Sequence, residues 1–163
     1  MPFLANTQIE IIHPNIPRGQ IHSALFDFDG TVSLIRQGWQ GVMIPMMVEI
    51  LRDLRSGESD QELTALVTEY VDRLTGKQTI YQMIELCHQI EQRGGQPREA
   101  LAYKHMYLDR LWDHIAHRVA ALKEGRTPAQ DLLVPGVLGA LENLQRRGVT
   151  CYLASGTDQP YVI

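Results

Sequence analysis

The sequence predicts an α/β protein in which a bundle of helices is inserted directly after the first buried strand. Two apolar stretches carry this prediction. The first lies within "IHSALFDF" (residues 21–28), whose "ALF" suits a strand buried on both faces of a parallel sheet. The second, "VTCYLA" (Val149–Ala154), follows a helical segment and a glycine, which is half of a βαβ unit. Between them the pattern is helical.

The chain ahead of the first buried strand predicts little regular structure. "QIEII" at Gln8–Ile12 predicts a short strand, and the following "HPNIPRGQ" predicts a loop because two prolines interrupt it. A chain of 163 residues is expected to form one domain, here with a large insertion. We therefore assign residues 1–36 and 128–163 to the α/β part and residues 37–127 to the helical insertion.

Four helices are predicted within the insertion. Apolar residues at helical spacing mark the first, from Trp39 to Leu54, and Pro45 is expected to start or kink it. Ser59 and Glu62 form a capping box at the start of the second helix. The helical pattern breaks at "GKQT" and then resumes for a third helix, which Gly94–Gly95 ends.

The fourth helix of the insertion is predicted to be the longest and to open at Pro97. Its expected apolar stripe comprises Leu101, His105, Leu108, Trp112, Ile115, Val119 and Leu122. After the insertion, the pattern predicts a further helix from about Gly136 to Arg147, which Gly148 ends before the last strand.

The composition excludes several classes of protein. A net charge of −4 argues against a nucleic-acid partner, and 44% hydrophobic residues with 21% charged residues indicate a globular chain with a sizeable core. Two cysteines are too few for a disulfide scaffold and favour a reducing compartment. The N-terminus has no signal-peptide pattern, and no apolar run approaches the roughly 20 residues that span a bilayer. We expect a cytoplasmic protein without a membrane partner.

Two carboxylates, Asp27 and Asp29, follow the first buried strand one residue apart. They lie on one side if the backbone stays extended, and close carboxylates repel unless a cation or proton intervenes. Mg²⁺ would relieve this repulsion and bring a substrate phosphate with it. Asp27 is then the candidate nucleophile, and Asp29 is the candidate general acid/base.

Further groups are expected to hold the phosphate. Gly30 and Thr31 offer backbone N–H groups, and Ser155 offers a hydroxyl at the matching end of the last strand. Ser155 in "SGTDQP" also suits the N-cap of a helix, so its two roles stay open and are compatible. Arg36, at the border of the insertion, is a further candidate for binding substrate.

Two motifs resemble signatures of the haloacid dehalogenase-like (HAD) superfamily. "FDFDGT" is similar to the first signature, an apolar strand followed by Asp-x-Asp-Gly-Thr, and "CYLASGT" is similar to the second, an apolar strand ending in Ser or Thr. The resemblance implies a Rossmann-like HAD core, incomplete at the C-terminus, with an inserted helical-bundle cap. It also implies a Mg²⁺ cofactor held at Asp27 and Asp29.

The resemblance further implies an aspartyl-phosphate intermediate at Asp27 and phosphate binding at Ser155 and Gly156. Lys77 lies in the break between two cap helices, and the resemblance implies that a loop in this place contacts the substrate. Asp29, in place of Tyr, points to phosphoryl transfer rather than dehalogenation. Thr31 favours a phosphatase acting on a small phosphorylated metabolite over a sugar phosphomutase, which remains the alternative.

The third and fourth signatures of this superfamily, a Lys and an acidic pair, would lie downstream of Ser155. The lysines Lys77, Lys104 and Lys123 all precede it. We therefore expect the 163 residues to be an N-terminal portion of a longer enzyme, with slow or absent hydrolysis on its own. A further alternative is a catalytically inactive fragment that associates with a partner chain, and self-association through uncovered apolar surface is expected.

Overall fold

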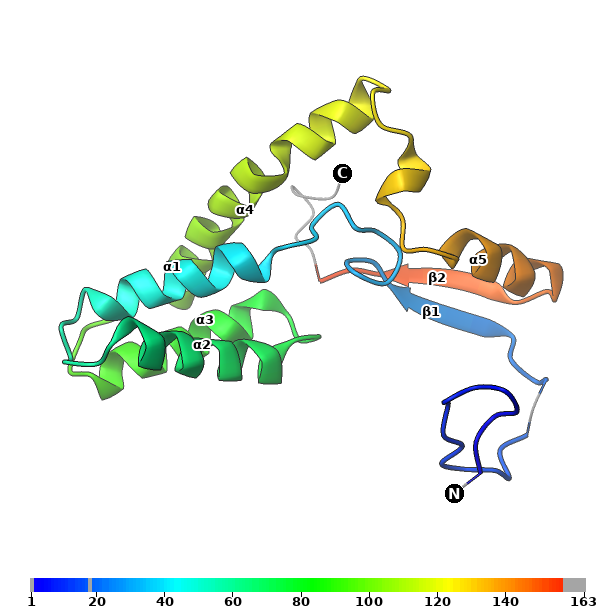
Figure 1. Ribbon diagram of the computed structural model, residues 1–163, viewed down its shortest axis with the longest axis horizontal. Helices are drawn as coiled ribbons and strands as arrows, with labels where there is room; N and C mark the ends of the chain where they lie inside the picture. The colour runs from blue at the N-terminus through cyan, green and yellow to red at the C-terminus, as the bar shows by residue number, and fades with distance from the viewer. Residues whose placement is uncertain (1, 18, 157–163) are drawn as a thin grey trace.

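The computed structural model describes residues 2–17 and 19–156. Within these residues, a bundle of four α-helices stands beside a small unit of two parallel strands and one helix, and the segment before the first strand lies apart from both (Figure 1). The elements are β1 (Ser23–Asp27), α1 (Gln40–Arg52), α2 (Asp60–Leu74), α3 (Thr79–Gln92), α4 (Ala100–Lys123), a 3₁₀ turn η1 (Ala129–Leu132), α5 (Val137–Arg146) and β2 (Thr150–Ala154). No helix among them has both the length and the hydropathy needed to cross a membrane.

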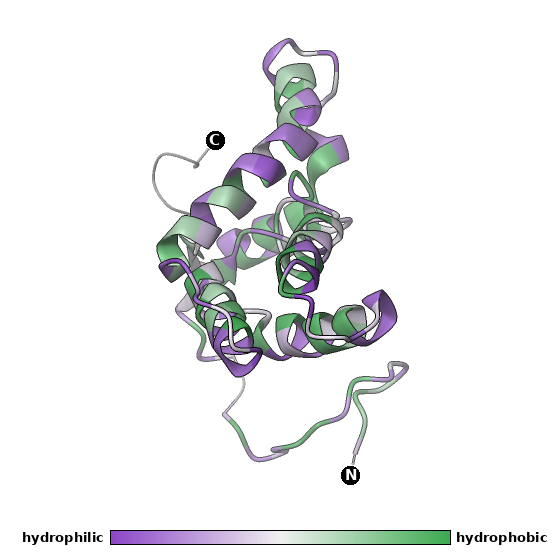
Figure 2. Cartoon of the chain, turned by 90° about the vertical axis from the view of Figure 1, so that its left-hand side faces the viewer, coloured by the Kyte–Doolittle hydropathy of each residue, from purple (hydrophilic) through white to green (hydrophobic). Residues whose placement is uncertain are grey.

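The hydrophobic core lies inside the bundle of α1–α4, as the predicted stripes require. Met43, Met46 and Met47 of α1 are almost fully buried, and they pack with Leu63 and Tyr70 of α2. The Tyr70 hydroxyl donates to the Met47 sulfur at 3.1 Å, so the polar atom of this buried ring has a partner. The apolar side of each helix turns inward, and the outer sides are largely hydrophilic (Figure 2).

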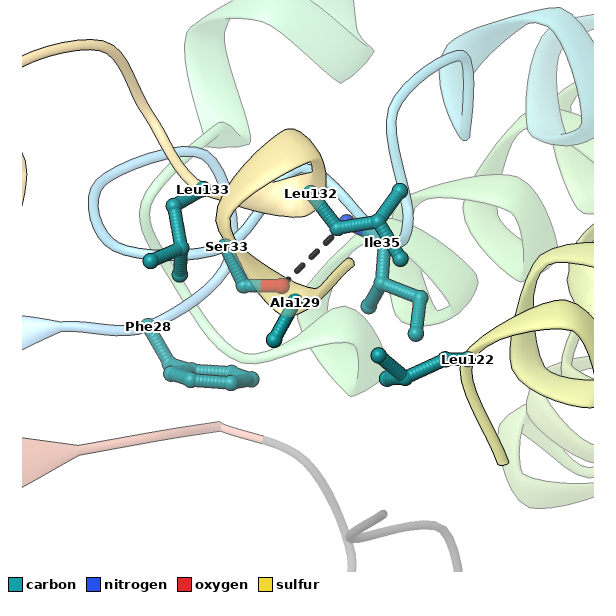
Figure 3. A pocket seen from close by; sticks show the side chains of 7 residues that line it. All are labelled: Phe28, Ser33, Ile35, Leu122, Ala129, Leu132 and Leu133. Carbon is teal, nitrogen blue, oxygen red and sulfur yellow. Dashed lines mark hydrogen bonds between the residues drawn. The ribbon is translucent and has the colours of Figure 1, made fainter. Parts of the chain in front are cut away.

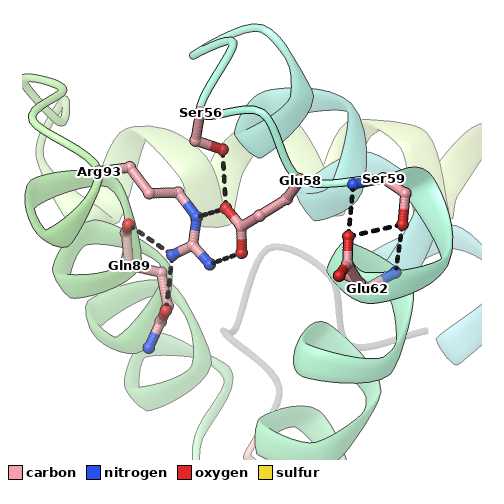
Figure 4. Close-up of polar contacts among 6 residues, drawn as sticks. All are labelled: Ser56, Glu58, Ser59, Glu62, Gln89 and Arg93. Carbon is pink, nitrogen blue, oxygen red and sulfur yellow. Dashed lines mark hydrogen bonds and ion pairs between the residues drawn. The ribbon is translucent and has the colours of Figure 1, made fainter.

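The capping box predicted for the second helix is present at the start of α2. The Glu62 backbone N–H donates to the Ser59 hydroxyl oxygen at 3.3 Å, and the Ser59 backbone N–H donates to the Glu62 carboxylate at 2.8 Å (Figure 4). Two of the backbone donors that a helix start leaves without intrahelical partners are thereby satisfied. The Glu62 carboxylate accepts hydrogen bonds from the Ser59 backbone N–H and from the Ser59 hydroxyl, the latter at 2.7 Å, and these two bonds lower its pKa below the usual value.

Replacing Ser59 with alanine is expected to destabilise the protein by about 1 kcal/mol, because the Glu62 N–H loses its acceptor. Urea denaturation followed by far-UV circular dichroism measures this change. Ser59→Asp is the matched control, since it keeps a capping oxygen and should remain close to the wild type. Equal losses in both variants would contradict a capping role.

A bidentate ion pair ties the turn between α1 and α2 to the end of α3. Arg93 donates to the two carboxylate oxygens of Glu58 at 2.6 and 2.7 Å, and its third nitrogen donates to the backbone carbonyl and the side chain of Gln89 (Figure 4). Hydrogen bonding from Arg93 lowers the pKa of Glu58. A lowered pKa means that this stabilisation is present at neutral pH and is lost as the pH falls through the carboxylate's native pKa.

The apolar stripe predicted for the longest helix is wrong in part. α4 begins at Ala100, three residues after Pro97, and Leu108, Ile115 and Val119 are buried as predicted. Leu101 and Trp112 are instead 49% and 40% exposed, and His105 is exposed. The positions that replace them in the core are Tyr103, Tyr107 and Leu111. The buried face is therefore turned relative to the prediction, and it carries two tyrosines.

The prediction of a Rossmann-like core is wrong for the described residues. They are mostly helical and contain a sheet of only two strands, whereas a Rossmann-like core needs a larger sheet. The strand predicted at Gln8–Ile12 does not form, since only Glu10 makes an isolated antiparallel bridge, to Phe3. Prolines at positions 14 and 17 interrupt the segment that would extend such a strand.

The two strands that do form pair in parallel, as expected of half a βαβ unit. Their register places Ser23 beside Thr150 and Asp27 beside Ala154. Helix α5 packs against β2, and Val149 just before this strand is buried. The sheet thus receives cover from one helix only among the described residues.

Two linkers join the bundle to the sheet, and they pair with each other. The Leu34 N–H donates to the Leu132 carbonyl at 2.7 Å, and the Val134 N–H donates to the Val32 carbonyl at 3.0 Å. Arg118 of α4 then fixes the outgoing linker by donating to the carbonyls of Ile35 at 3.0 Å and Gln37 at 2.7 Å. The two linkers that connect the insertion to the rest of the chain therefore lie side by side, next to the end of β1.

Candidate functional site

The carboxyl ends of β1 and β2 form one edge of the sheet, and two of the predicted site residues lie there. Asp27 is the last residue of β1 and is exposed. It lies beside Ala154, and the exposed Ser155 follows directly. The expectation that the two strand ends share an edge is confirmed by the parallel register. Gly156 is the last residue of the described segment, so a helix that Ser155 might cap lies outside the described residues.

A tight turn after β1 carries Asp29. The Phe28 carbonyl accepts hydrogen bonds from the N–H groups of Val32 and Ser33, both at 2.9 Å. Gly30 has a φ of +81°, a left-handed conformation that glycine adopts without steric cost. Its N–H donates to the Ser33 carbonyl at 2.8 Å, and the Thr31 N–H makes a longer bond of 3.4 Å to Phe28. In this conformation the Gly30 N–H is thus engaged by the turn itself.

Arg36 lies beside Asp29. Its Nη1 is 3.5 Å from Asp29 Oδ2, and the side chains are 15% and 30% exposed respectively. The Asp29 Oδ1 atom is buried. A guanidinium at this distance offsets part of the negative charge that two nearby carboxylates would otherwise accumulate. The structure therefore places Arg36, predicted as a candidate for binding substrate, beside the carboxylate predicted as the general acid/base.

Tyr107 of α4, which the sequence prediction did not include, is influenced by the charges of Arg36 and Asp29. Its side chain is buried, and burial raises the pKa of its hydroxyl above the usual value; Arg36 opposes this shift and Asp29 adds to it. The hydroxyl therefore lies within the electrostatic influence of both charged groups. The signal was present in the sequence as two tyrosines four residues apart on one helix, Tyr103 and Tyr107. The predicted apolar stripe passes through other positions of this helix, so it does not include these tyrosines.

The donor types near the turn are those that a hydrated divalent cation takes, whereas a fully enclosed cation would need more protein ligands. Asp27 and Asp29 supply carboxylate oxygens, which are the donors that Mg²⁺ prefers. No group of three or more His, Cys, Asp or Glu side chains in residues 2–17 and 19–156 is arranged to hold a metal ion. Mg²⁺ sites commonly use one or two carboxylates and take the remaining ligands from water and substrate phosphate. Two carboxylates are therefore a sufficient donor set.

Lys77 does not join the other predicted site residues through any described contact. It is exposed in the turn between α2 and α3, after Gly76, which has a φ of +87°. This turn lies at the end of the bundle nearer to the sheet (Figure 1). Its role in binding substrate stays a prediction.

An apolar pocket of about 140 Å³ lies where the two linkers meet α4 (Figure 3). It is lined by Phe28, Ser33, Ile35, Leu122, Ala129, Leu132 and Leu133. The Ser33 hydroxyl accepts the Ile35 N–H at 3.2 Å, so the polar side chain of this pocket serves the linker backbone. The apolar lining does not suit a phosphate group, and it includes Phe28, the residue between the two aspartates.

A larger, open depression of about 490 Å³ surrounds Glu58 and Arg93 at the opposite end of the bundle. The charges of these two residues neutralise each other, which makes this depression a poor candidate site. The candidate site is therefore the edge formed by Asp27 and Ser155 together with the turn that carries Asp29, beside which Arg36 lies. Comparison of the chain with protein-family models, with curated proteins and with solved structures finds no match.

Proposed function

We propose that the protein is a Mg²⁺-dependent phosphatase that hydrolyses a small phosphorylated metabolite through a phosphorylated Asp27. One observation carries this proposal: a carboxylate ends a strand at an open sheet edge, and a second follows within a glycine turn, 3.5 Å from a guanidinium. The resemblance of "FDFDGT" to the first HAD signature supports the same assignment. The predicted cytoplasmic location stays part of the proposal.

In the first step, a carboxylate oxygen of Asp27 attacks the phosphorus atom of the substrate. A bond forms between this oxygen and phosphorus while the bond from phosphorus to the ester oxygen breaks, and Asp29 gives its proton to the leaving oxygen. In the second step Asp29 takes a proton from water, whose oxygen attacks phosphorus and releases Asp27 and inorganic phosphate. A Mg²⁺ ion held by Asp27 and Asp29 would offset the charge of the phosphate oxygens.

The helical insertion favours a small substrate. Its two linkers meet beside the turn that carries Asp29, and Arg118 holds the outgoing linker against α4. The bundle therefore stays close to the site on a short connection. A helical domain that closed over the site from this position would exclude macromolecular substrates and water.

The proposal is tested by two measurements on the purified chain. The first is release of inorganic phosphate from a panel of small phosphomonoesters, with Mg²⁺ or with excess EDTA. The second is ¹⁹F NMR with beryllium fluoride, which mimics a phosphoryl group on a carboxylate and reports the site even when turnover is slow. We expect a bound ¹⁹F signal that requires Mg²⁺. Absence of both bound fluoride and phosphate release would refute the proposal, and phosphate transfer to a second substrate hydroxyl would identify a phosphomutase.

Replacing Asp29 with asparagine is expected to lower the rate of phosphate release roughly 10²–10⁴-fold, because the leaving oxygen loses its proton donor. The loss should shrink for p-nitrophenyl phosphate, whose leaving group needs little protonation, compared with an alkyl phosphate. A purely structural Asp29 would lower both rates alike. The ratio of the two rates is therefore the measurement that distinguishes an acid/base role from a structural one.

A non-catalytic chain that associates with another polypeptide is the second candidate function. The specific observation in its favour is the exposure of Leu25 and Tyr152 on the sheet, at 71% and 56%. Association and catalysis are compatible, so this observation does not weaken the proposed activity.

A further inference from the structure

Exposed apolar side chains are concentrated in one part of the molecule. Fourteen large hydrophobic side chains of the described residues are exposed, and nine of them lie either ahead of β1 or on the two strands. The five others are spread over α3, α4 and α5. The nine are Phe3, Leu4, Ile9, Ile12, Ile16, Ile21, Leu25, Tyr152 and Leu153.

One face of the sheet lacks cover. Ala24 and Cys151 are partly buried on the side that α5 covers, whereas Leu25 and Tyr152 point to the other side and are mostly exposed. The register places these two side chains next to each other. Parallel sheets are almost always buried on both faces, and two strands alone are marginal in water. This face therefore needs an apolar partner.

The segment before β1, which we call the arm (residues 2–17), is an apolar segment of the kind that could cover this face. Its internal bonds include Leu4 N–H to the Ile9 carbonyl at 2.9 Å and Ile11 N–H to the Pro2 carbonyl at 2.8 Å. No described backbone hydrogen bond joins the arm to the rest of the chain, and it lies apart from the helices in both views (Figures 1 and 2). Glu10 is its one Asp, Glu, Lys or Arg residue. An apolar, nearly uncharged segment is suited to burial.

The combined area of these surfaces matches what a stable dimer needs. Leu153 lies on the side of β2 opposite Tyr152, so it is left out of the estimate. At roughly 150–200 Å² for a whole large apolar residue, the other eight side chains offer on the order of 700–950 Å² per chain at their exposed fractions. A stable interface of standard size buries about 800 Å² on each partner. Patches of this size on a monomer mark interaction sites.

We propose that a second copy of this chain covers these surfaces, with the arm of each copy lying over the Leu25–Tyr152 face of the other. The exchange is reciprocal, so a two-fold axis closes the assembly as a dimer. The cover comes from apolar contact, and the near absence of charge on the arm avoids burying an unpaired ion. This proposal does not depend on the proposed function.

Sedimentation velocity of the full chain over a range of concentrations tests the dimer. We expect dimers at micromolar concentrations, and Leu25→Lys and Ile12→Lys should each raise the dissociation constant at least tenfold. Ile84→Lys is the matched control, because Ile84 is 50% exposed on α3, away from both surfaces, and should leave the constant within twofold. Circular dichroism checks that each variant folds. A wild-type chain that stays monomeric up to about 100 µM would overturn the proposal, as would a dimer insensitive to both substitutions.

Disulfide trapping tests the arm's position. In a background of Cys87→Ser and Cys151→Ser, chains with Ile12→Cys are mixed with chains with Tyr152→Cys and oxidised gently. We expect mixed dimers that join position 12 of one chain to position 152 of the other. Preferential joining of two chains through position 152 would instead indicate that the sheet faces pack on each other, and would overturn the arm exchange. Neither readout uses catalysis, so failure here and failure of the proposed function are separable.

Discussion

Replacing Asp27 with asparagine is expected to reduce phosphate release by on the order of 10⁴-fold or more, because the nucleophile itself is removed. The amide oxygen is a poor nucleophile and cannot form a stable phosphoryl adduct, while the side chain keeps its size and shape. Asp27 is exposed at the end of β1, so the fold does not depend on its charge. Phosphate release with Mg²⁺ and the beryllium fluoride signal should both be lost together.

Asp109→Asn is the matched control for this substitution. Asp109 is exposed on α4, so its replacement removes the same charge from the protein without changing the turn after β1. It should leave phosphate release within twofold of the wild type. Near wild-type release in Asp27→Asn would show that Asp27 is not the nucleophile. Equal losses in the two variants would show that net charge, rather than a specific carboxylate, governs the rate.

Replacing Leu63 with alanine is expected to cost about 2–5 kcal/mol of unfolding free energy, the largest effect on stability. Leu63 of α2 is fully buried within the bundle core, and its removal leaves a cavity that the surrounding helices fill only in part. Urea denaturation measures this change as a lower midpoint at constant slope.

Leu101→Ala makes the same chemical change at a helix position that is 49% exposed, and it should change stability by less than about 0.5 kcal/mol. The two variants share the gain in helix propensity, so their difference isolates burial. A loss below about 1 kcal/mol for Leu63→Ala would mean that α2 is not packed against the bundle as described.

Local signals in the sequence were sufficient for much of the fold. The Ser59–Glu62 capping box depends only on residues three positions apart, and it starts α2 as predicted. The two strand segments and their parallel pairing followed from apolar runs and the helix between them. The buried face of α4 could not be predicted from such local signals. Tyrosine, leucine and tryptophan recur at several helical spacings there, and contact with α1 and α3 decides which ones become buried.

The fold class was wrong because a resemblance over two short motifs was extended to a whole sheet. The segment Gln8–Ile12 has the composition of a strand, but no neighbouring strand pairs with it in the described residues, and it joins the arm. At the site, the shared edge of Asp27 and Ser155 was predictable from strand direction. The Arg36–Asp29 pair and the approach of Tyr107 were not, because they depend on how the insertion is attached to the turn.

The pairing of the two linkers has a consequence for the order of folding. Ser23 and Thr150 pair although they are 127 positions apart (150 − 23). Once the helices form and hold Leu34 beside Leu132, only about a quarter of that length remains flexible. Each halving of a loop lowers its closure entropy cost by about 0.6 kcal/mol, so prior folding of the helices favours strand pairing by roughly 1.2 kcal/mol. We therefore expect the contacts within the bundle to form before the strands pair, so that Asp27 and Ser155 reach the same edge late in folding.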